Sequence, residues 1–212
     1  MTSHDVIDYL RRISIERTIG HAGTLDPNAS GLLLVAIGRE YTKRLQEFVG
    51  LDKEYEADIS LGKISTTYDA EGELSPISTY QPSLHEINHA FEKLTGKIEQ
   101  KPPIFSAKKI QGQKAYDLAR RGEEVDLKPM VVTIYKIELV SYQYPILKIR
   151  VRVSSGTYIR SLAHDLGQIL GTGAYLYDLV RTSIGQYNLN KSLVLRKIKT
   201  MEDLEECRIL LQ

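Results

Sequence analysis

The chain has 212 residues, with 28 Lys and Arg against 27 Asp and Glu, one Cys and no Trp. A chain of this length buries roughly 70% of its unfolded surface on folding, so it can form a substantial core. Its 42% hydrophobic and 26% charged content excludes disordered and collagen-like chains. The longest apolar run, residues 31–38, is too short to span a bilayer, so we expect no membrane association. Cys207 cannot form an internal disulfide, which favours a reducing, cytoplasmic location.

Helical and strand-like segments alternate along the chain, and no segment resembles a linker, which predicts a single domain over residues 1–212. Helices are indicated by apolar residues at helical spacing, and strands by short runs rich in Val, Ile and Tyr. The pattern predicts helices over 5–12, 41–49, 83–94, 158–170 and 201–211, and strands over 31–38, 55–61, 130–140, 146–153 and 176–187. The order lacks a strict β-α-β rhythm and favours an α+β fold with a mixed, largely antiparallel central sheet flanked by helices.

Charged residues are segregated along the sequence although they nearly cancel in total. Acids are concentrated in 52–73 and 202–206, and bases in 11–17, 43–44 and 108–121. A folded surface could therefore present a basic face that attracts an anionic ligand. The alternative is that these runs are ordinary solvated surface.

One metal-binding pattern occurs, at His85-Glu86-Ile87-Asn88-His89, which matches the H-E-x-x-H arrangement of zinc proteases. Helical spacing places Leu84, Ile87, Phe91 and Leu94 on the core-facing side and turns both histidines outward. Glu86 also fits a capping box with Ser83, and no third histidine ligand follows. We therefore expect no metal site.

The segment 20–31, Gly-His-Ala-Gly-Thr-Leu-Asp-Pro-Asn-Ala-Ser-Gly, predicts a rigid loop that leads into a strand and holds polar side chains in place. Asp26 lies inside this loop, with Pro27 restricting its backbone. Asp26 is a candidate catalytic carboxylate, and the alternative is an aspartate that only stabilises a turn.

A second candidate is Arg160, in Ser154-Ser-Gly-Thr-Tyr-Ile-Arg-Ser161, where a strand ends and a helix begins. An arginine in the first helical turn could pair with a carboxylate across a cleft and keep it ionised. The alternative is an ordinary surface arginine.

These stretches resemble, in order, the motifs of the TruB family of pseudouridine synthases. The resemblance runs from Thr2 to about Tyr187. The matching motifs are Gly20-His-x-Gly-Thr-Leu-Asp-Pro-x-Ala-x-Gly31, Lys53-Glu-Tyr55, Thr67-x-Asp69-x-x-Gly72, Gln100-x-Pro-Pro103 with Ser106-Ala-x-Lys109, Gly156-Thr-Tyr-Ile-Arg160, Asp165-Leu-Gly167 and Leu179-x-Arg-Thr182.

The resemblance implies a pseudouridine synthase fold with a catalytic cleft. It also implies an enzyme that flips a uridine out of the T-loop of tRNA, at position 55, and isomerises it to pseudouridine without a metal or organic cofactor. Asp26 matches the essential aspartate, Arg160 the arginine that pairs with it, and Tyr55 the tyrosine that stacks on the base and helps to remove its carbon 5 proton. His21 matches a histidine that occupies space in the opened T-loop, and Leu179 an apolar pocket residue.

The basic segment 108–121 matches the part of the family that folds over the RNA. Its charge suits phosphate contacts, with Lys108, Lys109, Arg120 and Arg121 as the expected contributors. We expect a monomer that binds the T-arm of tRNA and has no obligate protein partner.

Two departures from the family pattern are apparent: the N-terminal strand with its Lys-Pro motif and the C-terminal RNA-binding extension are both missing from this sequence. An inactive RNA-binding or tRNA-folding module on the same scaffold remains the alternative. A guide-RNA-dependent relative is less favoured, because its usual companion domain is missing.

Overall fold

The computed structural model describes residues 1–106, 109–110, 113–114, 121 and 127–205. The chain forms two compact units: unit 1 comprises residues 1–55 and 180–212, and unit 2 comprises residues 56–179. Each unit is described by itself. Among the described residues, no helix is both long and apolar enough to cross a membrane.

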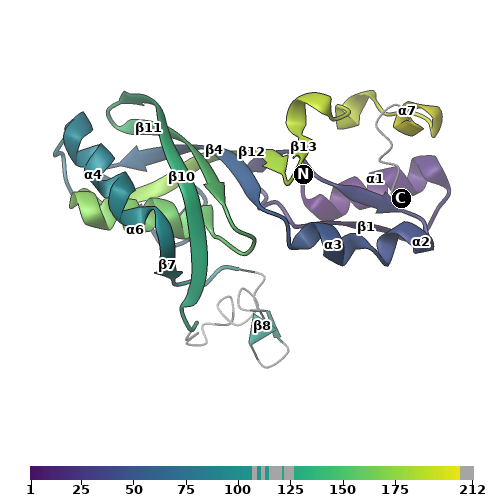
Figure 1. Ribbon diagram of the computed structural model, residues 1–212, viewed down its shortest axis with the longest axis horizontal. Helices are drawn as coiled ribbons and strands as arrows, with labels where there is room; N and C mark the ends of the chain where they lie inside the picture. The colour runs from purple at the N-terminus through teal and green to yellow at the C-terminus, as the bar shows by residue number, and fades with distance from the viewer. Residues whose placement is uncertain (107–108, 111–112, 115–120, 122–126, 206–212) are drawn as a thin grey trace. The chain divides into compact units, whose positions relative to one another are not determined.

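Unit 1 contains short helices and strands from both ends of the chain (Figure 1). Its elements are α1 (Ser3–Ser14), β1 (Ile19–His21), β2 (Ala29–Gly31), β3 (Val35–Ile37), α2 (Arg39–Thr42), α3 (Leu45–Val49), the beginning of β4 (Lys53–Leu61), the end of β12 (Ala174–Ile184), β13 (Tyr187–Asn188), the 3-10 turns η1 (Leu189–Lys191) and η2 (Leu195–Lys197), and α7 (Glu202–Glu205).

Helix α1 begins with a capping box in which the Thr2 hydroxyl accepts from the Asp5 amide and the Asp5 carboxylate accepts from the Thr2 amide. Its apolar side buries Ile7 and Leu10 against Ile19 of β1, and this small cluster is one part of the core of unit 1. The helix ends at Ile15, which has a left-handed backbone with φ 60°.

Two segments of unit 1 differ from the prediction. The apolar run 31–38 is not one buried strand: β2 ends at Gly31, and β3 begins at Val35 and pairs antiparallel with β1. Leu32 is buried, whereas β3 is half-buried, because only one side of this two-stranded sheet packs on α1. The predicted helix 41–49 is divided into α2 and α3.

Unit 2 is built on long strands and two helices (Figure 1). Its elements are the rest of β4, β5 (Lys63–Ser65), β6 (Leu74–Pro76), α4 (Leu84–Leu94), β7 (Gly96–Gln100), β8 (Lys109–Ile110), β9 (Gln113–Lys114), β10 (Met130–Gln143), β11 (Ile146–Val153), α6 (Ile159–Leu170) and the beginning of β12. Within unit 2 the strands of the main sheet have the order β12-β4-β11-β10-β7, and within unit 1 the end of β12 pairs with β13 and β2.

The predicted α+β fold is confirmed. Strand β10 pairs antiparallel with both β11 and β7, and β11 alternates buried and exposed residues along most of its length. The buried side meets α4 and α6, which pack against each other. Its core residues include Ile59, Ile134, Leu147, Ile149, Val151, Ile87, Phe91, Leu162 and Leu166.

The predicted capping box of α4 is present, with Ser83 and Glu86 bonded in both directions. Leu84 was predicted on the core-facing side but is 55% exposed, and Ala90 is buried with Ile87, Phe91 and Leu94 instead. Leu84 is the first residue of the helix and lies before its packed turns.

The acidic tract 52–73 is partly neutralised within the fold. On the face of the sheet opposite the core, Glu56 of β4 pairs with Arg150 of β11 at 2.7 Å, and Asp58 pairs with Lys148 at 3.2 Å. Strand pairing thus places acids of one strand beside bases of the next.

Candidate active site

The Asp26 loop, residues 22–28, connects β1 to β2 in unit 1. The Ser3 hydroxyl accepts a hydrogen bond from the Leu25 amide at 3.0 Å, and the Ala29 amide donates to the Asp26 carbonyl at 2.9 Å. These bonds join the loop to the first turn of α1 and close a turn at Asp26. The predicted rigid loop is therefore present, with Asp26 half-buried within it.

His21 is the last residue of β1, immediately before this loop. Its Nδ1 is buried, and none of the described residues offers it a hydrogen-bond partner. Burial lowers the pKa of His21, as does the positive charge of Arg181. The imidazole is therefore neutral at pH 7.

Tyr55 lies on β4 at the edge of unit 1, half-buried. Burial raises the pKa of its phenol. The positive charge and hydrogen bonding of Arg181 lower the pKa of Tyr55, whereas the negative charge of Asp26 raises it further. Asp26, Tyr55 and Arg181 thus act on one another electrostatically within unit 1.

Arg181, on β12, is only 1% exposed. Its Nε donates to the Leu32 carbonyl at 2.8 Å, and one terminal nitrogen donates to the Gly23 carbonyl at 3.1 Å. The Tyr55 phenol opposes the lowering of the Arg181 pKa that burial causes. The family motif includes this residue, but no local sequence pattern predicts that a buried arginine links the Asp26 loop electrostatically with Tyr55.

Arg160 occupies the first turn of α6 in unit 2, as predicted, and is 6% exposed, so it is not a surface arginine. One terminal nitrogen lies 3.3 Å from the Asp69 carboxylate, and the other donates to the Phe105 carbonyl at 3.0 Å. Asp69 also accepts from the Thr67 hydroxyl at 2.6 Å. In the sequence, Asp69 belongs only to an acidic tract and a family motif. Its pairing with Arg160 becomes visible when the two segments are brought together in the fold.

The aromatic ring of Tyr68 adjoins this ion pair. It stacks on His164, one helical turn after Arg160, with ring centroids 4.1 Å apart and planes inclined by 13°. The backbone of Tyr68 is left-handed, with φ 64°. The loop that carries Asp69 is therefore attached to α6 by an ion pair and an aromatic stack.

The remaining predicted site residues lie on three segments. Leu179 is buried on β12 within unit 2. Lys109 begins the short strand β8, and Arg121 is exposed and donates to the Gln113 side chain at 2.5 Å. Lys108 and Arg120 lie outside the described residues.

Asp26, His21 and Tyr55 belong to unit 1, and Arg160 and Leu179 to unit 2. The pairing of Arg160 with Asp26 would join the two units and stays a prediction. Each unit is consistent with the expected roles of its residues: one holds a half-buried carboxylate whose charge acts on the Tyr55 phenol, and the other a buried guanidinium held by Asp69 and a backbone carbonyl.

The H-E-x-x-H pattern lies on the exposed side of α4, as predicted. His85 and His89 are both exposed, and His89 pairs with Glu92 at 3.4 Å. Within the described part of the chain, no three His, Cys, Asp or Glu side chains come together in a way that could hold a metal ion.

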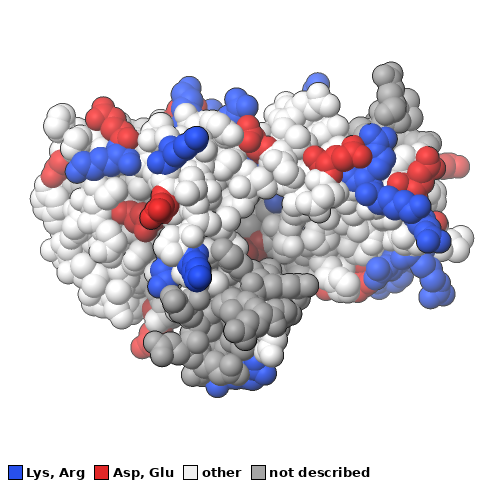
Figure 2. Space-filling model, turned by 60° about the horizontal axis from the view of Figure 1, so that its bottom comes forward, with Lys and Arg blue, Asp and Glu red and all other residues white. Residues whose placement is uncertain are grey.

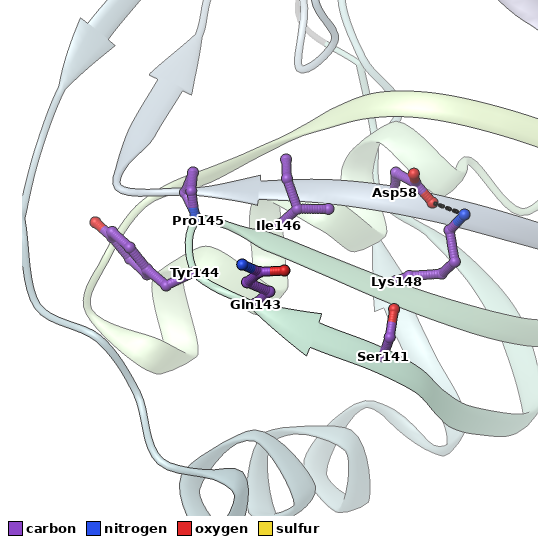
Figure 3. A pocket seen from close by; sticks show the side chains of 7 residues that line it. All are labelled: Asp58, Ser141, Gln143, Tyr144, Pro145, Ile146 and Lys148. Carbon is purple, nitrogen blue, oxygen red and sulfur yellow. Dashed lines mark ion pairs between the residues drawn. The ribbon is translucent and has the colours of Figure 1, made fainter.

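A shallow cavity lies where β10 turns into β11 (Figure 3). Figure 3 shows the Asp58 and Lys148 ion pair on one side of it and the Tyr144 ring on the other. Its lining is Asp58, Ser141, Gln143, Tyr144, Pro145, Ile146 and Lys148, which includes none of the predicted site residues.

Comparison with known proteins relates nearly the whole chain to one family. Residues 11–159 match "TruB family pseudouridylate synthase (N terminal domain)", and residues 160–211 match "tRNA pseudouridylate synthase B C-terminal domain". A protein named tRNA pseudouridine synthase B from Protochlamydia amoebophila is 46% identical, over 97% of this chain and 78% of that protein. A protein of the same name from Bacteroides fragilis is 44% identical, over 94% of this chain and 86% of that protein.

Solved structures show the same fold. A Cbf5-Nop10-Gar1 complex contains a chain with a TM-score of 0.69 and 29% identity, matched over 89% of this chain and 46% of its own length. An archaeal box H/ACA sRNP Nop10-Cbf5 complex contains a chain with a TM-score of 0.69 and 25% identity. The match covers 98% of this chain and 55% of that chain. The chain thus spans about half the length of these structural relatives.

Proposed function

Because the chain belongs to the TruB family of pseudouridine synthases, we propose that it converts a uridine of tRNA into pseudouridine. The reaction breaks the bond between N1 of the base and C1′ of the ribose, rotates the base and forms a bond from C5 to C1′. C5 loses a proton and N1 gains one, so the composition of the RNA is unchanged.

One structural observation supports this proposal most directly. Within unit 1, the motif loop holds the Asp26 carboxylate half-buried, where its charge acts on the phenol of Tyr55. Loss of the base needs a group that attacks C1′ or takes the 2′ proton, and an ionised aspartate can do either. Loss of the C5 proton then needs a base, which Tyr55 would supply.

Arg160 would pair with Asp26 and hold its carboxylate in the ionised form, as in the family. A guanidinium that Asp69 and a backbone carbonyl already fix would lose little further freedom in doing so. Leu179 would pack beside the flipped base, and the neutral ring of His21 would occupy the space it leaves in the T-loop.

The substrate would be recognised mainly through phosphates of the T-arm, at the uridine at position 55. Figure 2 shows Lys and Arg side chains concentrated at the right-hand end of one face, where Figure 1 places α1 and α2 of unit 1. Arg12, Arg17, Arg39 and Lys43 are exposed residues of that part. With the basic segment 108–121, they would make phosphate contacts for a monomeric, cytoplasmic enzyme.

The decisive experiment measures tritium release from carbon-5-labelled uridine in an unmodified tRNA transcript. The wild-type chain should release tritium, and Asp26→Asn should release none while keeping its circular dichroism spectrum. Asp8→Asn, at an exposed aspartate of α1, is the matched control and should retain full activity. Tritium release by Asp26→Asn would refute the catalytic assignment.

The same assay separates an enzyme from an inactive RNA-binding module. A pure binder would shift the transcript in a gel without releasing tritium. Arg160→Ala should lose activity while still folding, although the loss of its pair with Asp69 lowers its stability. A folded Arg160→Ala enzyme at full rate would refute its pairing with Asp26.

A further inference from the structure

Arg181 is a buried cation whose observed partners are all uncharged. Its side chain donates to the Leu32 carbonyl and the Gly23 carbonyl, and its charge acts on the Tyr55 phenol. Removing a guanidinium from water is expensive, and neutral acceptors return only part of that cost. An arginine serving stability alone would be replaced by an apolar side chain at little loss, so its position calls for a functional explanation.

The two carbonyl partners bracket the Asp26 loop. Gly23 lies three residues before Asp26, and Leu32 lies just after β2, so the guanidinium fixes both ends of the segment that carries the carboxylate. The backbone reinforces this arrangement, because the Leu32 amide donates to the Arg181 carbonyl at 2.8 Å.

One glycine of the motif loop, Gly31, makes room for Arg181, and a second, Gly23, lies next to its guanidinium. A Cβ on Gly31 would overlap the backbone of Arg181, and a Cβ on Gly23 would lie 3.5 Å from the guanidinium. Both glycines have positive φ, 105° and 91°, which other residues rarely adopt. The glycine spacing of the motif is thus explained in part by the close approach of the loop to β12.

Arg181 also acts on the Tyr55 phenol, which would remove the C5 proton, and so relates that phenol to the Asp26 loop. Building on the proposed function, we propose that Arg181 is a positioning residue of the reaction, which holds the Tyr55 oxygen and the Asp26 loop in one arrangement and stabilises the phenolate form of Tyr55. The phenolate takes the C5 proton, and the electrons of the broken C–H bond restore the C5–C6 double bond.

The electrostatics of unit 1 support this role. Burial and the Asp26 charge both raise the pKa of Tyr55, which disfavours the phenolate, and Arg181 is the group that opposes them. A hydrogen bond from a cation stabilises an anionic acceptor more than a neutral one. Without Arg181, Tyr55 should ionise at higher pH.

The chain allows this ionisation to be measured directly, since it contains 13 Tyr and no Trp. Subtracting the ultraviolet pH titration of Tyr55→Phe from that of the wild type isolates the Tyr55 phenol. The same subtraction is made for Arg181→Met, which is similar in length but uncharged, using Arg181→Met with Tyr55→Phe as its reference. In Arg181→Met, we expect the pKa of Tyr55 to be about one unit higher than in the wild type, which at neutral pH means about tenfold less phenolate.

Kinetics provide the second readout, with Arg181→Lys as the conservative variant. Lysine keeps the charge but cannot match the geometry of a guanidinium that donates to two separate carbonyls. We expect kcat to fall about tenfold or more for both variants, with KM for tRNA changed less than about threefold. Arg150→Lys, at an arginine of β11 that pairs with Glu56 and lies outside the basic segments, should change neither parameter.

A double-mutant cycle distinguishes positioning from a general structural role, and also covers poor folding of Arg181→Met. If Arg181 acts through Tyr55, Arg181→Lys should reduce the rate much less in the Tyr55→Phe background than in the wild type. Additive losses, or an unchanged Tyr55 pKa with an unchanged kcat, would overturn the inference. If the wild type itself makes no pseudouridine, the proposed function fails instead.

Discussion

The guanidinium of Arg160 lies 3.3 Å from the carboxylate of Asp69, and their side chains are only 7% and 12% exposed. Asp69 also accepts hydrogen bonds from the Thr67 hydroxyl and the Glu71 amide. The bonds of both terminal nitrogens limit the orientations open to Arg160. Burial of the pair also makes each partner costly to remove, because the other would remain buried and unpaired.

Asp69→Asn should therefore destabilise the protein and reduce its activity. We expect a loss of about 3 kcal/mol in the free energy of unfolding, measured with urea, together with a lower kcat. Glu56→Gln, which breaks the more exposed pair with Arg150, should cost less than about 1 kcal/mol. Equal losses for the two variants would show that burial does not govern these pairs.

Ile15→Gly should stabilise the protein. Ile15 is 89% exposed and left-handed at the end of α1, where a β-branched side chain is strained and glycine is not. We expect a gain of about 0.5–1 kcal/mol, after allowing for the greater freedom of glycine in the unfolded chain. Arg12→Gly, inside the same helix, should lose about 1 kcal/mol. Thermal melts of the three proteins test the sign of each change.

Gly31→Ala should be strongly destabilising. Its φ of 105° and its contact with the Arg181 backbone leave no place for a methyl group, so we expect a loss of at least about 2 kcal/mol. Gly50→Ala is the matched control, because Gly50 has φ −74° and nothing within 4 Å of the added atom. Gly50→Ala should be neutral or slightly stabilising, and a reversed order would contradict the packing at β2.

Stability should depend on Asp165 as pH changes. Burial raises the pKa of Asp165 to about 6, above its value of 3.8 in the unfolded chain. The folded state therefore binds the proton more tightly, and the stability this adds is complete below pH 4 and lost as pH rises through about 6. Asp165→Asn should raise the melting temperature relative to wild type increasingly from pH 4 to pH 7. A constant difference would contradict the raised pKa.

RNA affinity should fall steeply with salt. Each phosphate contact contributes about 0.7–0.9 to the slope of log affinity against log salt concentration. Arg17→Gln, in the exposed basic region of unit 1, should make the slope shallower by the amount that one phosphate contact contributes. Lys93→Gln on α4 should leave the slope unchanged. A flat salt response of the wild type would show that the separated charges do not form a binding face.

Local patterns predicted the regular elements well. The cap at Ser83 and the periodicity up to Leu94 define α4 because both signals lie within one helix. Strands β10 and β11 were likewise evident from their composition, and α6 ends at Leu170, where the predicted helix 158–170 ends. The apolar run 31–38 was wrongly predicted as one strand, because its composition does not show where one strand ends and the next begins.

Contacts between distant segments could not be predicted in the same way. Asp69 and Arg160 are 91 residues apart, and Arg181 is 158 residues from Gly23. Nothing near either arginine in sequence distinguishes a buried guanidinium from a surface one. Only the pairing of strands and the packing of α6 decide which carbonyls and carboxylates each arginine meets.

Strand β10 has one further consequence, for self-association. Its first five residues pair with β7, and in the described part of the chain no strand covers the same edge beyond Ile134. An open edge of this kind invites pairing with another copy. Here the register shifts between Ile134 and Lys136 and between Leu139 and Ser141, and the Lys136–Glu138 ion pair lies between the two irregularities. Bent and charged, this edge is a poor template for a second strand, which should protect the protein from aggregation at high concentration.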